Sequence, residues 1–158
     1  MLARPDIYTL VAGAGEGTSA LNSFDAALLA AGIGNLNLLR VSSILPPGAV
    51  FRPELSVPPG SLLPVAYGAI TSVTPGQSIA AAVAVGRSDP AEFGIIMECS
   101  GHCTSQEIEA RIRAMMREAF AMRGMPLLEL AVKSVAWRVA KVATALAAVP
   151  LWYAQAWK

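Results

Sequence analysis

Apolar residues along the chain fall mostly into short runs that are typical of strands. A run over residues 36–43, rich in leucine and ending in Val41, Ser42 and Ser43, predicts a buried strand with the two serines at its far end. Further strands are expected at residues 65–73, 79–85, 93–99, 130–139 and 142–153. The pattern predicts a protein with a high sheet content.

A shorter apolar run at residues 7–11 predicts one more strand, which leads into the glycine-rich stretch GAGEG at residues 13–17. Because glycine adopts backbone angles that other residues avoid, this stretch is expected to be a loop. It resembles phosphate-binding loops, but it lacks the spacing and the acidic residue of a dinucleotide fingerprint. A nucleotide site is therefore a weak prediction.

Two segments show helical periodicity. In the first, Asn22 or Ser23 is the expected N-cap, the helix stops near residues 32–34, and Asp25 lies in its first turn. The second, residues 104–124, begins with a capping box of Thr104 and Glu107. Its expected apolar stripe consists of Ile108, Ile112, Met115 and Ala119. Helices that cover strands in this way predict an α+β sandwich.

Composition narrows the class of protein. A chain of 158 residues fits a single domain, and 12 basic against 11 acidic side chains argue against nucleic acid or an anionic membrane surface as a partner. Hydrophobic residues make up 54% of the chain and charged residues 15%, which is more apolar surface than one small domain needs to hide. We therefore expect a homo-oligomer.

Location and membrane association follow from two further features. Two cysteines and no signal peptide predict a cytoplasmic protein without a disulfide framework. The longest uncharged run, residues 142–157, is shorter than the ~20 residues of a membrane span and contains Pro150. We interpret this run as core or subunit interface.

Conventional catalytic and metal motifs are weak in this sequence. Cys99, His102 and Cys103 are close together, but a closed zinc site needs four ligands, so reduced structural cysteines are the favoured interpretation. His102 is the one histidine, and no nucleophile-elbow motif accompanies it. Neither a metal centre nor a serine-hydrolase site is expected.

The stretch VSSILPPG, residues 41–48, carries a different chemistry. The hydroxyl of Ser43 could attack the carbonyl carbon of Ser42 and convert the amide to an ester, if the backbone is strained and donors hold the oxyanion. Elimination would cut the chain and leave a dehydroalanine, which hydrolyses to a pyruvoyl group. Pro46 and Pro47 restrict the backbone that follows. From the serines alone, a structural strand end is nevertheless the better interpretation.

A resemblance reverses that preference. The segment LNSFDAALLAAGIGNLNLLRVSSILPPGA resembles the self-cleaving segment of the pyruvoyl-dependent arginine decarboxylases, and GAGEG, LLPVAYG, GIIMECSGHC, EAFAMRG and ALAAVPLWY resemble other stretches of that family in the same order. The resemblance implies a single-domain, four-layer αββα sandwich. It also implies a cut between Ser42 and Ser43, giving a β chain of residues 1–42 and an α chain of residues 43–158. Trimers of the cleaved pair, with active sites at subunit interfaces, are the implied assembly.

The same resemblance implies the reaction. L-Arginine would form an imine with the pyruvoyl group derived from Ser43 and lose CO2 to give agmatine, with neither pyridoxal phosphate nor a metal. Glu98 matches the family's proton donor, and burial among Ile95, Ile96 and Met97 would raise its pKa. The product would serve polyamine synthesis or acid tolerance.

Three other positions match family site residues. Asn37 matches an amide that can bind the cleavage oxyanion or the substrate, and Asp25 matches the carboxylate that binds the guanidinium group. Ser42, as a new C-terminal carboxylate, would add a second anion near the substrate. On a straight strand Asn37 would lie about 20 Å from Ser43, so we expect Asn37 to serve a neighbouring subunit.

Each match has a plainer alternative. Glu98 could face water or join an ion pair, and an acid in the first turn, as expected for Asp25, is favoured by the helix dipole alone.

Gln77 stands where relatives commonly have an acid, and the loop before the first helix varies, which leaves the substrate preference open. The alternative functions are a pyruvoyl decarboxylase for another amino acid and a non-processing structural or regulatory relative.

Overall fold

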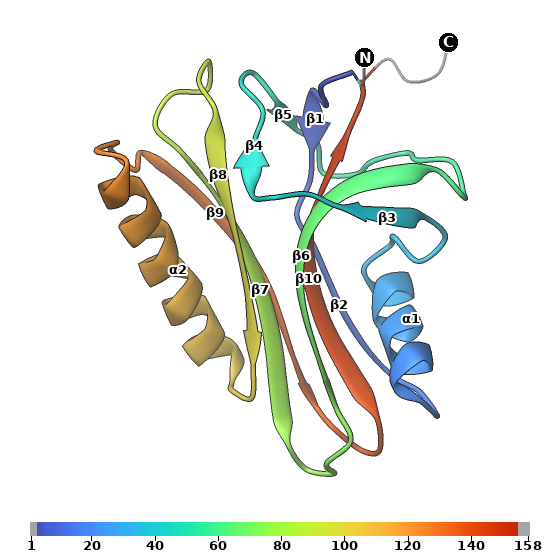
Figure 1. Cartoon of the computed structure of the whole chain (residues 1–158). Helices are drawn as coiled ribbons and strands as arrows, with labels where there is room; N and C mark the ends of the chain where they lie inside the picture. Colours follow the sequence, from blue (N-terminus) through green and yellow to red (C-terminus); the bar gives the residue numbers. More distant parts are fainter. Residues whose placement is uncertain (1–2, 155–158) are drawn as a thin grey trace.

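The strands form two sheets that lie face to face, with one helix on the outer side of each sheet (Figure 1). The computed structural model describes residues 3–154. In chain order the elements are β1 (Ile7–Tyr8), β2 (Val11–Glu16), α1 (Ala20–Ala30), β3 (Asn37–Arg40), β4 (Ile44–Leu45), β5 (Val50–Phe51), β6 (Leu62–Ser72), β7 (Ser78–Arg87), β8 (Gly94–Gly101), α2 (Ser105–Met122), β9 (Glu129–Arg138) and β10 (Ala143–Trp152). This is the mixed α+β domain that the alternation of strands and helices predicts.

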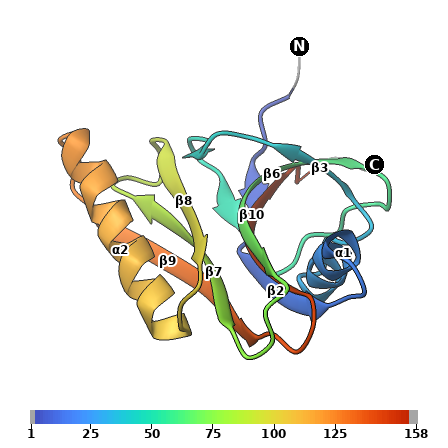
Figure 2. The ribbon, with the colours of Figure 1, turned by 60° about the horizontal axis from the view of Figure 1, so that its bottom comes forward.

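The two sheets differ in size and order. One runs β3-β6-β10-β1-β5 and also includes β2, which pairs with β10; the other runs β4-β8-β7-β9. Pairing is antiparallel except between β3 and β6 and between β1 and β5. Figure 2 shows α2 along the outer face of the second sheet and α1 against the first.

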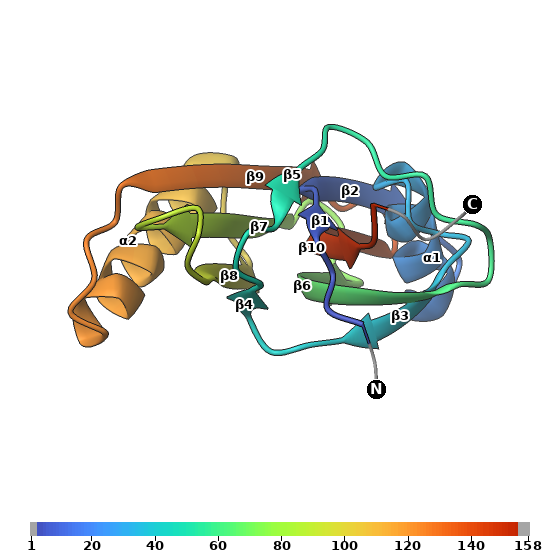
Figure 3. The same ribbon diagram turned by 90° about the horizontal axis from the view of Figure 1, so that it is seen from above.

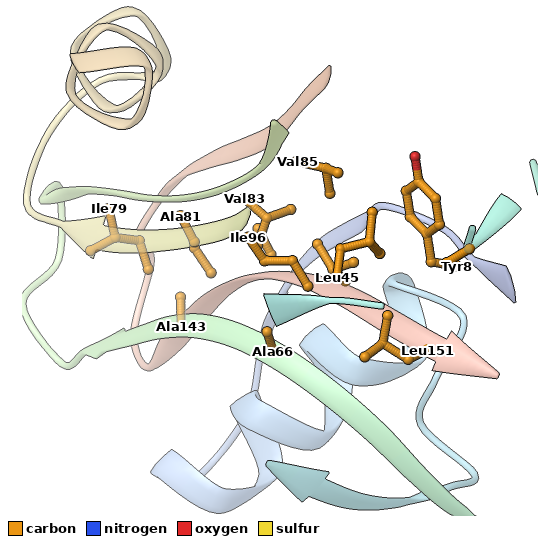
Figure 4. Close-up of a cluster of buried hydrophobic side chains, with 14 of the residues drawn as sticks. Tyr8, Leu45, Ala66, Ile79, Ala81, Val83, Val85, Ile96, Ala143 and Leu151 are labelled. Atoms are coloured by element: carbon orange, nitrogen blue, oxygen red, sulfur yellow. The ribbon is translucent and has the colours of Figure 1, made fainter. Parts of the chain in front are cut away.

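The main core lies between the sheets, and β7 and β10 are its central strands. On β7, Ile79, Ala81 and Val83 point between the sheets, whereas the alternate residues pack against α2. Ala143 on β10 and Ile96 on β8 join the same central cluster (Figure 4). Both strands are buried on two faces, which is why their sequences are almost continuously apolar. Residues 143–152 of the uncharged run are therefore core, and its residues 155–157 lie outside the described residues.

The GAGEG stretch is a strand and not a loop, so that prediction is wrong. Gly13, Gly15 and Gly17 have no positive φ angle. A Cβ atom on Gly13 would lie 2.4 Å from the carbonyl oxygen of Ala27, and one on Gly17 would lie 2.4 Å from the Ser23 nitrogen, both in α1. The glycines let the backbone of α1 approach β2 closely.

The first helix begins earlier than expected. Its N-cap is Ser19, whose side chain accepts a hydrogen bond from the backbone N–H of Asn22 at 3.1 Å. Asn22 and Ser23 therefore lie inside the helix, and Asp25 is in the second turn, beyond the range in which the helix dipole favours an acid. Gly32 with a φ of 78° follows the helix end, as a C-terminal glycine does.

The predicted capping box and end of the second helix are confirmed. The Thr104 side chain binds the backbone N–H of Glu107, and the Glu107 side chain binds back to Thr104. The buried stripe includes Met116 and Phe120, whereas Met115, expected in the stripe, is only partly buried. Among the helices of the described residues, none is long and apolar enough to cross a membrane.

The strand expected over residues 36–43 is shorter and more exposed than predicted. It covers only Asn37–Arg40, mostly solvent-exposed at the edge of its sheet, and ends before the serines. A leucine-rich run in an edge strand has the same sequence pattern as a buried strand, because the pattern does not show whether another strand pairs with it on each side. The five later strands match their predicted positions with shifts at the ends.

Candidate active site

The bond between Ser42 and Ser43 lies where the chain passes from one sheet to the other. Upstream, the N–H of Val41 donates to the carbonyl oxygen of Val65 on β6 at 3.1 Å. Downstream, the carbonyl oxygen of Ser43 accepts from the N–H of Ile96 on β8 at 2.8 Å. Figure 3 shows the chain running from β3 in one sheet to β4 in the other. The peptide bond between the serines therefore spans two independently held strands.

A carboxylate meets the second serine at this crossing. The hydroxyl of Ser43 donates a hydrogen bond to Oε2 of Glu98 at 2.9 Å, and both side chains are partly buried. The residues are 55 positions apart, so only the pairing of β4 with β8 brings them together. A serine hydroxyl bonded to a carboxylate is oriented, and its proton has an acceptor.

The alternation of β8 explains where Glu98 points. Ile96 belongs to the core between the sheets, whereas Ile95 and Met97 pack on the side of α2. Glu98 lies two residues after Ile96 and shares its face. Of the three apolar neighbours expected around Glu98, only Ile96 is on the same side of the strand.

Close contact between β6 and β8 supports this geometry. A Cβ atom on Gly68 would lie 3.2 Å from the carbonyl oxygen of Cys99, and the Ser100 hydroxyl donates to the Ala69 carbonyl oxygen at 3.0 Å. Gly68 thus allows the backbone of β8 to approach β6 right beside Glu98. Sequence reasoning missed this residue, although a glycine inside a strand pattern signals a close backbone approach.

The carbonyl group of Ser42 also has a defined partner. Its oxygen accepts a hydrogen bond from the backbone N–H of Ile44 at 2.8 Å. None of the non-glycine residues in the described range has a positive φ angle. The backbone strain expected at the two serines is therefore not a left-handed backbone conformation. The donor is a main-chain group, and no side-chain motif could have revealed it.

Two predicted site residues lie apart from this pair in the single chain. Asn37 is exposed at the start of β3, and its Nδ2 donates to the carbonyl oxygen of Gly60 at 2.7 Å. Asp25 is exposed on α1, which packs on β2, β10 and β6 and not on the sheet that carries Glu98. Over residues 3–154, no hydrogen bond joins either residue to Ser42, Ser43 or Glu98.

The cysteines near this strand do not form a metal site. Burial raises the pKa of Cys99 to about 11, and burial also raises the pKa of Cys103, so both thiols keep their protons at neutral pH. Both are free, and His102 is exposed. No group of three or more His, Cys, Asp or Glu residues in the described part of the chain could hold a metal ion.

A cavity of about 500 Å³ lies elsewhere, beneath the loop that precedes β6. Its lining includes Thr9, Leu29, Ile33, Glu54 and Leu63, and none of the predicted site residues. The Ser43–Glu98 pair is therefore separate from this hollow.

These features define a class of protein before any relative is considered. It is a mixed α+β domain in which a serine and a carboxylate meet at a chain crossing between two sheets.

Comparison with known proteins identifies the family. The family described as "Pyruvoyl-dependent arginine decarboxylase (PvlArgDC)" matches residues 7–155. The chain is 46% identical over 150 residues to the pyruvoyl-dependent arginine decarboxylase of Methanocaldococcus jannaschii, covering 94% of this chain and 91% of that protein. It is 44% identical over 148 residues to the enzyme of the same name from Pyrococcus abyssi, covering 92% and 94%. The chain belongs to the pyruvoyl-dependent arginine decarboxylase family.

The family membership confirms the resemblance read from the sequence and the expected cofactor. Members are pyruvoyl-dependent, so their electrophile is a pyruvoyl group and not pyridoxal phosphate. The site fits such a group, because a serine stands on the chain crossing with its hydroxyl bound to a carboxylate.

Proposed function

We propose that this protein cuts itself between Ser42 and Ser43 and then decarboxylates L-arginine to agmatine and CO2. The observation that carries the proposal is the hydrogen bond from the Ser43 hydroxyl to Glu98. It places the side chain that would become the pyruvoyl group next to a carboxyl group, the kind of group that can exchange a proton with a substrate. The relatives that share the family are named as enzymes of this kind.

The fold supports a cut that does not release either piece. The segment before the bond is held to β6 and the segment after it to β8, so each new end keeps its own hydrogen bonds. The β chain of residues 1–42 would also stay paired through β1 and β2 with β10. The helix–sheet–sheet–helix order supports the four-layer αββα sandwich implied by the resemblance.

The roles of the remaining residues follow from their positions. A pyruvoyl group supplies a carbonyl that accepts the electron pair released with CO2. Glu98 lies within hydrogen-bond reach of the Ser43 side chain, so it is placed to hold a proton and return it to the substrate's α carbon. Ile96, a core residue two positions earlier on the same face of β8, is an apolar neighbour of Glu98 along that strand.

Substrate recognition requires a second chain in this proposal. Asp25 and Asn37 are both exposed and neither contacts Ser43 in its own chain. Large apolar side chains are also exposed along β3 and on its neighbours, with Leu39 on β3 48%, Ile44 on β4 42% and Leu62 on β6 68% accessible. Such a patch supports an interface between subunits, in which Asp25 and Asn37 of one chain complete the site of the next. A trimer of cleaved pairs is the assembly we propose.

Intact mass measurement tests the processing step. Wild-type protein should yield two fragments that meet at Ser42 and Ser43, the larger with a blocked start that a carbonyl reagent labels. Ser43→Ala should remain a single unlabelled chain, because no hydroxyl is left to attack. Ser56→Ala is the matched control on an exposed serine and should be cut normally. An uncut wild-type oligomer would favour a non-processing structural or regulatory relative.

Mixed oligomers test the shared site. Asp25→Ala and Ser43→Ala chains, each inactive alone, should recover part of the arginine decarboxylase activity when co-expressed, because some sites would combine an intact Ser43 with an intact Asp25. Recovery of no activity would place Asp25 in the same chain's site or outside the site.

Arginine, ornithine, lysine and aspartate offered in turn separate the arginine enzyme from a decarboxylase for another amino acid. Product from lysine but none from arginine would remove the role of Asp25.

A further inference from the structure

The oxygen of the Ser42 carbonyl group would gain negative charge when Ser43 attacks it. In the described part of the chain, one donor is hydrogen-bonded to this oxygen, the N–H of Ile44 at 2.8 Å. A bond from residue i+2 back to residue i closes a γ-turn centred on Ser43. Because Ser43 has a negative φ, the turn is of the common inverse type that occurs where loops and strands meet.

The side-chain donor suggested by the family match is occupied elsewhere in the same chain. Nδ2 of Asn37 donates to the carbonyl oxygen of Gly60, at the far end of β3 from the serines. The amide of Asn37 therefore does not bind the Ser42 oxygen within one subunit. A main-chain donor is already in place.

We propose that the backbone N–H of Ile44 is an oxyanion donor for the self-cleavage reaction. The inference rests on the proposed function, because it assigns a group to the first chemical step of that processing. The N–H binds the very atom on which charge develops, and a donor placed before the reaction stabilises that charge without reorganisation.

The attack of Ser43 converts the amide bond between the two serines to an ester. The Ser43 hydroxyl oxygen forms a bond to the Ser42 carbonyl carbon and gives up its proton, while the carbonyl oxygen takes the negative charge beside the Ile44 N–H. The carbon–nitrogen bond then breaks, the Ser43 nitrogen takes up a proton, and an ester joins the Ser42 carbonyl to the Ser43 side chain. Loss of the Ser43 α proton expels the Ser42 carboxylate and leaves a dehydroalanine, and water converts that residue to a pyruvoyl group and ammonia.

The surroundings of Ile44 hold the donor in position. Ile44 pairs with Ile95 on β8, and the following Leu45 is fully buried. The carbonyl group of Ser43, which shares a peptide unit with the Ile44 N–H, is fixed by the Ile96 N–H at 2.8 Å. The orientation of that peptide unit is thus set from both sides of the bond.

Replacement of a single amide by an ester tests the proposal in the full-length chain. Incorporation of the α-hydroxy analogue of isoleucine at position 44 removes the N–H and keeps the side chain. Removal of one oxyanion donor lowers a rate by about 10²–10³-fold. We expect self-cleavage, followed by the mass of the fragments over time, to slow by about that factor.

Two ester substitutions serve as controls. An ester at Ala49 removes an N–H that binds the Pro46 carbonyl oxygen in the same segment, and it should leave cleavage near the wild-type rate. An ester at Ile96 removes the donor to the Ser43 carbonyl oxygen, so it measures how much looser anchoring alone slows the reaction. The Ile44 ester should be much slower than both.

Cleavage of the Ile44 ester at the wild-type rate, or no slower than the Ile96 ester, would overturn the inference. Should the Ile44 ester fail to fold, nuclear magnetic resonance on uncut Ser43→Ala protein keeps the proposal open to disproof. A scalar coupling across the hydrogen bond between the Ile44 nitrogen and the Ser42 carbonyl carbon is expected, and its absence would overturn the inference. An uncut wild type is a different result, which would remove the proposed function itself.

Discussion

The two helices are held to their sheets in different ways. α2 packs large side chains, among them Ile112, Met116 and Phe120, against small residues of β7 and neighbouring strands. α1 instead brings its backbone against the glycines of β2, where a single Cβ atom on Gly13 would overlap the helix. The α2 contact can adjust by side-chain rotation, whereas the contact between Gly13 and α1 is with helix backbone and has no side chain to move.

The candidate site residues are divided between the same two halves of the molecule, the sheet covered by α2 and the sheet covered by α1. Ser43 and Glu98 meet on the sheet that α2 covers, but Asp25 and Asn37 belong to α1 and to the sheet that α1 covers. The half that tolerates adjustment holds the proposed chemistry, and the rigidly seated half displays the proposed recognition groups on its surface. Rigid seating of α1 fixes where Asp25 is presented, which matters if a neighbouring chain must use it.

The largest effect should come from breaking the chemical pair. Glu98→Gln keeps the shape of the side chain and removes its ability to donate and accept a proton at neutral pH. Turnover of arginine per carbonyl-labelled chain should fall by about 100-fold or more, because general acid–base groups contribute about 10²–10⁴-fold. Glu92→Gln, the same change at an exposed position, is the control and should retain activity. Unchanged turnover in Glu98→Gln would contradict the role of this residue.

The next effect concerns the rigid contact. Gly13→Ala would place a Cβ atom 2.4 Å from the carbonyl oxygen of Ala27, so α1 must shift. We expect a loss of about 1–3 kcal/mol in the free energy of unfolding, measured by urea denaturation. Gly101→Ala is the matched strand substitution; the one close contact of its Cβ, at 2.9 Å, would be with the guanidinium end of Arg111, which can move away. Equal losses in the two variants would refute the contrast between the two halves.

A smaller effect is expected at the helix starts. Thr104→Ala removes the side-chain acceptor of the capping box of α2, while the backbone N–H of residue 104 keeps its bond to Glu107, and should cost about 1 kcal/mol. Ser19→Ala removes the capping acceptor of α1 and its bond to the Asn22 side chain, with no carboxylate that binds back to the N-cap, so its loss should be at least as large. Thermal denaturation of both variants beside wild type measures the two losses, and a clearly smaller loss in Ser19→Ala would contradict this expectation.

The smallest effect depends on pH. Glu16 accepts hydrogen bonds from the backbone N–H groups of Ala140 and Lys141 and from the Trp137 side chain. The bond from Ala140 is the largest of the causes that hold the pKa of Glu16 below its usual value. A lowered folded-state pKa adds stability above the unfolded-state value of about 4.3, and this is lost as the pH falls through the lower, folded-state pKa.

Glu16→Gln should therefore melt slightly below wild type at pH 7, and the gap should close in acid. Glu118→Gln, on the exposed face of α2, should show no such pH-dependent gap. A gap in melting temperature for Glu16→Gln that stays constant from pH 7 to strongly acidic pH would contradict the linkage.

Local patterns predicted the regular elements well and the unusual ones poorly. The capping box at Thr104 and the late strands were readable because caps and periodicity depend on neighbouring residues. GAGEG was misread as a loop, since the close approach of α1 to β2 is a long-range contact. Its alternating small residues fit a strand as well as a loop. Oligomeric state and cellular location stay predictions.

By itself, the sequence determined the family, and it predicted the two serines as the reactive position and Glu98 as the proton donor, because these inferences depend on which residues are present and in what order. Only the tertiary structure decided that Ser43 meets Glu98, that Asn37 faces Gly60, and that the Ile44 N–H binds the Ser42 oxygen. The physical reason is that a hydrogen bond needs atoms within about 3 Å. Such distances between residues far apart in sequence are set by strand pairing and sheet packing, which no local pattern records.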